Sequence, residues 1–350
     1  MALSLREKSV HVRKIHQGCS SSRCVNACAP NGNNSHMLNR RILRIKAFKV
    51  LYSYAVKGGM SLQDALAELD ASCESTRDLY LFMLALVAPL CEEEGRRIAA
   101  AKTKFNPTEE DLSASERFAS NRVATLLSED KDFQKLISKK GLSWDQYDIV
   151  IGKILNSVHG KQYYKKYMAL PEATLSDDCK VLSKVFEQEL VDMSEVEDLI
   201  EEKNISWTDE LAYALTWCCH TMDDLSHGEK WRLPSVYQSD MTLRRNPSAT
   251  VSSDRDFSRK LLSAAFSGYE NYFKKVVSMT PDWDSDRLFS ADMAIIALCM
   301  AEMDTFSDIP ARVSINEWVE ISKWYSSPKS SQFVNGILDK VLKEKSGAAE

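Results

Sequence analysis

Apolar residues recur at helical spacing along most of this chain. From Leu38 to Val56 they fall three or four residues apart, at Leu43, Ala47, Val50 and Tyr54, and the pair Gly58–Gly59 closes the segment. Residues at this spacing share one face of an α-helix, and glycine commonly follows a helix end. We therefore expect a first helix over residues 38–56.

The same spacing predicts a succession of further helices. Ser61 is expected to cap a short helix that ends near Leu69, and Pro89 should kink a long helix over residues 75–104. Thr108 and Asp111 have the spacing of a capping box. More helices are expected near residues 129–140, 143–168, 175–202, 207–225, 254–279, 285–303, 311–325 and 331–342. Because no segment alternates apolar and polar residues as a strand does, the predicted fold class is all-α.

Two segments depart from the helical pattern. Residues 1–36 are rich in Ser, Asn and Cys and lack a sustained hydrophobic period, so we expect a disordered tail. Met37, directly before the first helix, is a candidate for the true start of translation. Residues 228–253 contain two prolines and many small polar residues, which is typical of a linker. At 350 residues the chain is long enough for two domains or for one domain with a large insertion.

Charge and cysteine usage restrict the class of protein. A net charge of −5 argues against a polyanion-binding surface over the whole molecule, so any nucleic-acid site must be a local group of basic residues. Nine cysteines without a regular framework are typical of reduced thiols in a cytoplasmic protein. The apolar run from Leu79 to Leu90 is far shorter than the roughly 20 residues of a spanning helix, so no membrane partner is expected. Cys19, Cys24 and Cys28 lack the CxxC spacing of a zinc site.

The first predicted helix carries a group of basic residues. Between Met37 and Gln63 there is no Asp or Glu, but there are six cationic side chains: Arg40, Arg41, Arg44, Lys46, Lys49 and Lys57. On a helix the three arginines lie within about a quarter turn of each other, where their repulsion is relieved by a polyanion or by solvent. Guanidinium groups grip phosphates and stack on unpaired bases. Composition alone does not separate this interpretation from a solvated basic face.

Two stretches of the chain resemble the NusB family of transcription antitermination factors. Residues 40–52 (RRILRIKAFKVLY) are similar to the arginine-rich opening helix of that family. Residues 309–323 follow the family pattern IPxxVxINExxExxK, and residues 333–341 follow with FVNGxLDK. The resemblance covers residues 37–73 and 254–345. The intervening residues, 74–253, have no counterpart in short family members, although longer members carry a helical insertion there.

The resemblance implies a fold and a function. It implies a NusB-like core of two helical bundles over 37–73 and 254–345, with a helical insertion and linker over 74–253. Such a protein binds boxA-like single-stranded RNA together with the ribosomal protein NusE, within the transcription elongation complex. By position, the RNA would contact Arg40, Arg41, Arg44, Tyr325, Lys329, Ser330 and Phe333, and NusE would contact Tyr52 and Asp292. Lys329 departs from a position that is usually acidic in the family, which should favour RNA electrostatically.

Other functions receive less support from the residues. The chain has no GxG, GKS or GKT motif and no nucleophile–base pair of recognisable spacing, so we expect a non-enzymatic protein without cofactor or metal. The alternative from another class is a helical scaffold that has lost its affinity for RNA. A glycine inside the last predicted helix, Gly336, suggests close helix packing rather than chemistry.

Overall fold

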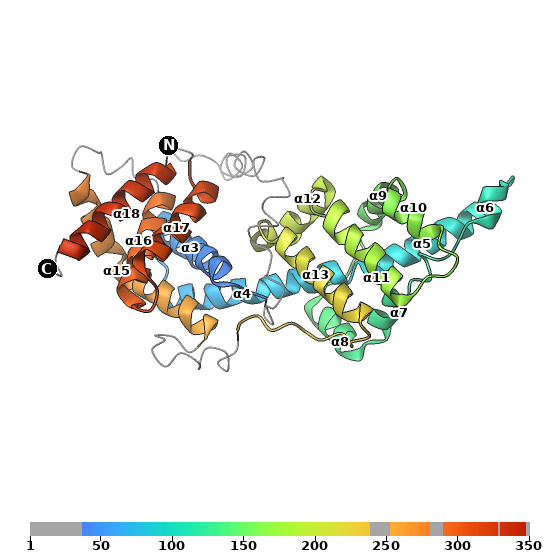
Figure 1. Ribbon diagram of the computed structural model, residues 1–350, viewed down its shortest axis with the longest axis horizontal. Coiled ribbons are helices and arrows are strands. Elements are labelled where there is room, and N and C mark those ends of the chain that lie inside the picture. Colours follow the sequence, from blue (N-terminus) through green and yellow to red (C-terminus); the bar gives the residue numbers. More distant parts are fainter. Residues whose placement is uncertain (1–36, 239–252, 281–289, 328–329, 348–350) are drawn as a thin grey trace. The chain divides into compact units, whose positions relative to one another are not determined.

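A computed structural model describes residues 37–238, 253–280, 290–327 and 330–347 of the chain (Figure 1). Helices make up the fold, and the described residues include no β-strand, only an isolated bridge at Ser235. The predicted all-α class is confirmed. The expected disordered tail, residues 1–36, lies outside the described residues, as does most of the expected linker. None of the helices in the described ranges is long and apolar enough to cross a membrane.

The chain divides into two compact units. The first unit takes in residues 37–73 together with the described residues from Ser235 onward, and the second takes in Glu74–Pro234. The boundary at residue 73 falls inside helix α4 (Leu62–Leu84). The other helices of the first unit are α3 (Arg40–Lys57), α15 (Asp254–Met279), α16 (Ser290–Thr305), α17 (Ala311–Tyr325) and α18 (Ser330–Gly347).

The second unit is a series of shorter helices. They are α5 (Val87–Lys102), α6 (Glu109–Ser113), α7 (Arg122–Glu129), α8 (Lys131–Lys140), α9 (Asp148–His159), α10 (Gln162–Met168), α11 (Leu175–Lys184), the π-helix η1 (Val185–Glu189), α12 (Ser194–Lys203), the 3-10 helix η2 (Ile205–Trp207) and α13 (Leu211–Ser226).

Several helices begin or end at residues of the types that commonly cap helices. Asn39 caps α3, and Gly58 ends it with φ 65° and ψ −177°, a conformation that is open mainly to glycine. Thr108 and Asp111 form the predicted capping box at the start of α6. At the start of α4, the Ser61 hydroxyl accepts a hydrogen bond from the Asp64 amide at 3.2 Å, which confirms the predicted cap.

The prediction of a short helix ending near Leu69 is wrong. Residues 70–77 contain no glycine or proline, and α4 continues through them to Leu84. The break comes instead at Ala85–Leu86, ahead of the proline that was expected to kink the helix. Because Pro89 has no amide hydrogen to donate to the Ala85 carbonyl, a new helix begins at Val87 with Pro89 in its first turn, where no intrahelical donor is required.

Helix α16 is the centre of the first unit. It is apolar on all sides, and the residues from Met293 to Ala301 are buried, as expected for a helix with neighbours all round. Helices α3, α15, α17 and α18 pack against it, and α3 also packs against α15 (Figure 1). The basic first helix is thereby held against helices more than 200 residues away in the sequence.

The chain leaves the first unit and returns to it at neighbouring points. The amides of Met37 and Leu38 donate to the carbonyls of Ser235 and Val236 at 2.7 and 2.9 Å. Beside this contact, burial raises the pKa of Tyr237, and so do the neighbouring Cys73 thiol and its hydrogen bond with the phenol. Cys73, the last residue before the second unit, therefore lies next to the segment that follows that unit.

Candidate nucleic-acid interface

The three arginines at the start of α3 reach carboxylates on three different helices. Arg40 lies 3.4 Å from Asp254 on α15. Arg41 donates from Nε and Nη2 to both oxygens of Glu317 on α17, at 2.8 and 2.6 Å. This two-point geometry is the strongest that an arginine and a carboxylate form. Each of the three guanidinium groups is therefore paired with a carboxylate of another helix, and Arg44 also lies 3.8 Å from Glu317.

Arg44 is the innermost of the three. Its Nε and Nη2 donate to the two oxygens of Glu302 on α16, at 2.8 and 2.7 Å, and the Glu302 side chain is fully buried. The same carboxylate accepts hydrogen bonds from the hydroxyl of Ser314 at 2.7 Å and from the indole of Trp318 at 2.9 Å. One carboxylate thus ties α3, α16 and α17 together.

An aromatic ring lies beneath two of the guanidinium groups. The Phe257 ring centroid is 5.0 Å from the guanidinium carbon of Arg40 and 5.4 Å from that of Arg44. Stacking of this kind is worth about 0.5–1 kcal/mol at exposed sites and more when the cation is desolvated. Phe257 itself is buried on α15, so Arg40 and Arg44 both lie over one ring of that helix.

Burial divides the predicted RNA-contacting arginines into two kinds. The side chains of Arg40 and Arg41 are each 32% exposed, whereas that of Arg44 is 5% exposed. Both NH2 groups of Arg40 lack a hydrogen-bond partner among the described residues. Lys46, another member of the basic group, is fully buried and donates to the Ser72 carbonyl at 2.7 Å. Solvent therefore reaches only part of the basic group.

One of the predicted RNA-contacting residues of α17 and α18 touches α3 through an aromatic contact. The ring of Tyr325, the last residue of α17, lies 5.2 Å from that of Phe48 on α3. Phe333 is half-buried on α18, and Ser330 is buried, with its hydroxyl 2.7 Å from that of Ser327. Lys329, also predicted to contact RNA, lies outside the described residues.

The two residues predicted to contact NusE lie in different surroundings. Tyr52 is 40% exposed and stacks on Phe48 at 5.9 Å. Asp292 is 3% exposed and accepts hydrogen bonds from Ser326 and Ser330. Burial raises the pKa of Asp292, and these two hydrogen bonds oppose the rise. The Asp292 side chain thus holds the turn between α17 and α18 and does not face outward.

Sequence reasoning missed the carboxylates that hold the arginines. Glu302 stands alone in the apolar stretch MAIIALCMAEM, and a lone carboxylate on a buried helix requires a cationic partner. The sequence alone therefore indicates that Glu302 has a buried cationic partner, although it does not identify that partner as Arg44. The hydrogen bond from Arg41 lowers the pKa of Glu317, against the effect of burial, so this carboxylate stays charged at neutral pH.

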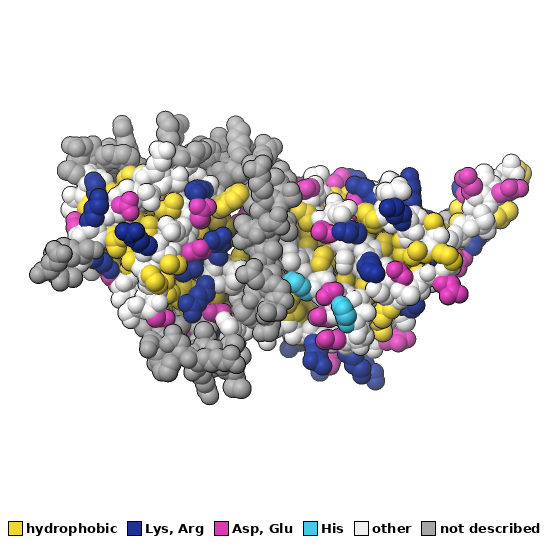
Figure 2. Space-filling model, viewed as in Figure 1, with side chains coloured by type: hydrophobic (Ala, Val, Ile, Leu, Met, Phe, Trp, Pro, Cys, Tyr) yellow, Lys and Arg dark blue, Asp and Glu magenta, His cyan; other side chains and the backbone are white. Residues whose placement is uncertain are grey.

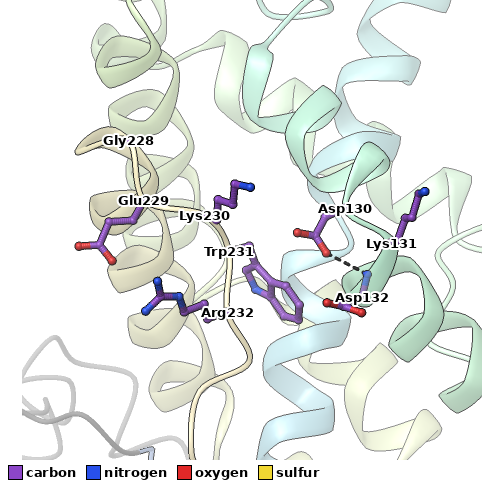
Figure 3. Close-up of a pocket in the computed structure, with 8 residues that line it drawn as sticks. All are labelled: Asp130, Lys131, Asp132, Gly228, Glu229, Lys230, Trp231 and Arg232. Atoms are coloured by element: carbon purple, nitrogen blue, oxygen red, sulfur yellow. Dashed lines mark hydrogen bonds between the residues drawn. The ribbon is translucent and has the colours of Figure 1, made fainter.

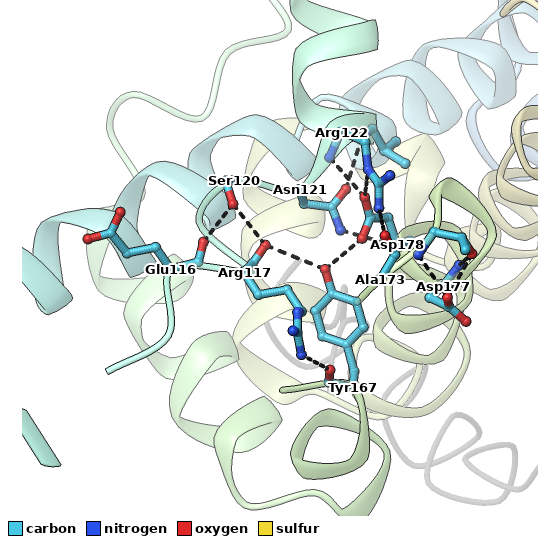
Figure 4. A network of polar contacts seen from close by, with 11 residues as sticks. Glu116, Arg117, Ser120, Asn121, Arg122, Tyr167, Ala173, Asp177 and Asp178 are labelled. Atoms are coloured by element: carbon cyan, nitrogen blue, oxygen red, sulfur yellow. Dashed lines mark hydrogen bonds and ion pairs between the residues drawn. The ribbon is translucent and has the colours of Figure 1, made fainter. Parts of the chain in front are cut away.

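In the second unit, buried carboxylates are satisfied by tyrosines of α10. Tyr164 donates to Glu94 at 2.9 Å, Tyr163 to Glu189 at 3.2 Å and Tyr167 to Asp178 at 2.7 Å. Figure 4 shows that Asp178 also accepts from the guanidinium and the amide of Arg122. Groups paired in this way hold helices together.

No metal site is apparent in the part of the chain that the structure describes. No three His, Cys, Asp or Glu side chains gather there as ligands would. Cys218 is buried and contacts the Tyr80 carbonyl through its thiol. Cys19, Cys24 and Cys28 lie outside the described residues.

Comparison with known proteins finds similarity at the end of the chain. The family model described as NusB family matches residues 231–343. A transcription antitermination protein NusB of Clostridium botulinum (strain Kyoto / Type A2) is 36% identical over 89 residues, which is 25% of this chain and 62% of that protein. Proteins of the same name from Chloroherpeton thalassium and Natranaerobius thermophilus are 36% and 38% identical over 90 and 84 residues.

These matches are partial on both sides. The match to the Chloroherpeton thalassium protein covers 26% of this chain and 43% of that protein. The match to the Natranaerobius thermophilus protein covers 24% of this chain and 60% of that protein. The chain therefore spans less than two thirds of the length of each of these relatives. No solved structure matches the chain significantly.

Proposed function

Because this chain belongs to the NusB family, we propose that it is an RNA-binding factor in transcription antitermination and elongation, which binds boxA-like single-stranded RNA together with the ribosomal protein NusE. The protein would act in the cytoplasm as a non-enzymatic component of the transcription elongation complex. It would need no cofactor.

One observation carries the proposal. Helix α3 lies outside the family match at residues 231–343, yet it packs onto two of the matched helices, α15 and α16. Its arginines form ion pairs with Asp254, Glu302 and Glu317, all within the match. The basic group and the matched helices consequently belong to one folded body, as a binding surface composed of both requires.

We assign the arginines different roles. Arg40 and Arg41 would contact RNA directly, since both reach solvent and Arg40 has donors to spare. An RNA phosphate would share Arg41 with Glu317 or replace that carboxylate. Arg44 would act as a positioning residue that holds α3 against α16.

Residues from the end of the chain would complete the surface. Tyr325 and Phe333 would stack on bases, and Lys329 would contact phosphates. Ser330, which is buried, would act on the RNA contact indirectly through its hydrogen bond to Asp292. Tyr52, exposed on α3, would contact NusE. Asp292 would serve both contacts indirectly, because it fixes the turn that precedes Ser330.

The test is a titration of fluorescent boxA-like RNA with the full chain, with and without NusE. We expect Arg40→Gln/Arg41→Gln to weaken binding at least tenfold per arginine, since a hydrogen bond to a charged group is worth about 1.5–3 kcal/mol. The log–log salt slope should flatten by about 1.4, or 0.7 for each phosphate that the variant no longer neutralises.

Lys274→Gln/Arg312→Gln is the matched control, because both side chains are exposed basic residues of the same unit and lie outside the basic group of α3. It should bind RNA nearly as the unchanged protein does. Equal affinity of the two double variants, with unchanged helical content, would contradict the proposed RNA surface.

A scaffold without RNA affinity is the second candidate function. It is favoured by the pairing of all three arginines with carboxylates, which lowers the local positive charge available to RNA. Capture of NusE by a chain that binds no boxA-like RNA would decide for the scaffold.

A further inference from the structure

Helix α8 of the second unit presents a row of lysines to solvent. Lys131, Lys135 and Lys139 follow one another at four-residue intervals and are exposed, while Phe133 on the opposite side is buried. Side chains at this spacing share one helix face. Figure 2 shows Lys and Arg side chains gathered at the lower edge of the view, where Figure 1 places α8.

These lysines lack the acidic partners that several other cations of the unit have. Elsewhere in the second unit, Lys153, Lys180 and Lys184 lie within 4 Å of a carboxylate; they face Glu195, Asp177 and Glu187. None of the three lysines on the α8 row forms an ion pair within the described residues, although Lys140, next in the sequence, pairs with Asp78.

Helix stability does not account for the row. Like charges four residues apart on a helix are destabilising by about 0.2–0.5 kcal/mol per pair. Lys131 is the first residue of α8, where the positive end of the helix dipole disfavours a cation. Lys139, in the last turn, is favourably placed for the dipole. Two of the three lysines thus gain nothing from the helix.

Two more cations stand beside the start of α8. Lys230 and Arg232 are exposed and line an open cavity of about 710 Å³ together with Lys131 (Figure 3). Between them Trp231 is fixed, with its ring 5.1 Å from Phe133 and its indole donating to Tyr80 at 2.9 Å. The segment is therefore anchored against α8, and its two cations line the same cavity as Lys131.

The cavity also contains carboxylates, which limits the kind of ligand. Asp130, Asp132 and Glu229 line it together with the three cations, so the charges of its lining nearly cancel. Asp130 accepts hydrogen bonds from the amides of Asp132 and Phe133, which directs its charge at the helix start. The cations extend beyond the cavity along α8 to Lys139, roughly 12 Å at 1.5 Å per residue. That length suits an extended polyanion better than a single small anion.

We propose that this basic face of α8, formed by Lys131, Lys135, Lys139, Lys230 and Arg232, binds the phosphate backbone of single-stranded RNA without regard to its sequence. Lysine is a compact charge on a flexible stem, suited to phosphates and not to the reading of base edges. The inference extends the proposed RNA-binding function and rests on it. The second unit would hold flanking RNA while the first unit recognises the boxA-like element.

The experiment measures the affinity of the full chain for two RNAs. One is a boxA-like 12-mer, which is about long enough for a single binding site, and the other is a 30-mer of oligouridylate, which is roughly 20 nucleotides longer. The variant is Lys131→Gln/Lys135→Gln/Lys139→Gln, because glutamine keeps helix propensity. We expect its affinity for oligouridylate to fall at least about tenfold at low salt, with a log–log salt slope flatter by about 2. Its affinity for the 12-mer should stay unchanged.

The control variant is Lys153→Gln/Lys180→Gln/Lys184→Gln, which alters net charge equally on the same unit. Oligouridylate binding that is equal in the two triple variants would overturn the inference, since net charge alone would then set the affinity. Failure of the unchanged protein to bind oligouridylate would overturn it as well. Failure to bind the 12-mer, with or without NusE, would instead count against the proposed function.

Discussion

The carboxylate of Glu302 offers the sharpest test of how the first unit is held together. It accepts two hydrogen bonds from Arg44 and one each from Ser314 and Trp318, and it is fully buried. Glu302→Gln preserves the size of the side chain but removes the charge. The Arg44 guanidinium would then lose its buried partner and keep only Glu317, 3.8 Å away and shared with Arg41. Removal of one partner of a buried ion pair costs about 3–5 kcal/mol.

The measurement is hydrogen exchange of the amides of α3 and α16, followed peptide by peptide. A local readout is needed because a chain of two units has no single well-defined unfolding transition. We expect the opening free energy of these helices to fall by about 3–5 kcal/mol in Glu302→Gln. Glu320→Gln on α17 is the control: its partner Lys323 is exposed, and such surface pairs contribute about 0–1 kcal/mol.

A double-variant comparison separates the ion pair from simple crowding. Arg44→Met alone leaves a buried carboxylate without its cation, whereas Arg44→Met/Glu302→Met removes both charges. We expect the double variant to lose less stability than the sum of the losses in Arg44→Met and Glu302→Met, by at least about 1 kcal/mol. A loss in Glu302→Gln no greater than in Glu320→Gln, or strict additivity in the double variant, would refute the reasoning.

Three other outcomes follow from the structure. Gly58→Ala should destabilise α3 by about 1–3 kcal/mol in denaturant unfolding because of the positive φ, whereas Gly336→Ala should stabilise α18 by up to about 1 kcal/mol. The pKa of Glu317 is lower in the folded protein than its ordinary value of 4.5, so the stability it contributes is present above pH 4.5 and is lost as the pH falls through the folded value. The protection of the α17 amides, taken relative to their intrinsic exchange rate at each pH, should fall there, and should fall less in Glu317→Gln. Replacement of Glu74–Pro234 by a short Gly–Ser linker should leave the first unit folded, as measured by circular dichroism. Its affinity for the boxA-like 12-mer, measured by titration, should be unchanged. An unfolded product would contradict the prediction that this segment is an insertion.

Much of the fold was predictable because its determinants are local. Helical spacing of apolar residues and caps such as Thr108 with Asp111 depend on neighbours within a few residues, and the all-α class and this cap are confirmed. The single helices expected over 143–168 and 175–202 are wrong, because each segment is broken in the structure. The helix end expected near Leu69 is wrong because residues 70–77 contain no glycine or proline, and without either the helix continues to Leu84. That residues 74–253 are an insertion stays a prediction.

The candidate site was less predictable because its determinants are distant. The spacing of Arg40, Arg41 and Arg44 suggested one basic surface, but Arg44 is paired with a glutamate 258 residues away and is buried. No local pattern specifies that partner. The expectation of close packing at Gly336 is wrong for the opposite reason: the residue is exposed, and an added Cβ would meet nothing within 4 Å. Its lack of a side chain has no packing explanation within the described residues.

The closeness of Cys73 to Tyr237 has a consequence for how such a protein can vary. A chain that departs and comes back at adjacent points can carry a folded body of almost any size there, provided that the ends of that body also meet. The entropy of closing a loop rises only with the logarithm of its length, by about 0.6 kcal/mol per doubling, so tolerance at this site depends on geometry and hardly on size. The same site would accept a reporter domain whose termini are close together.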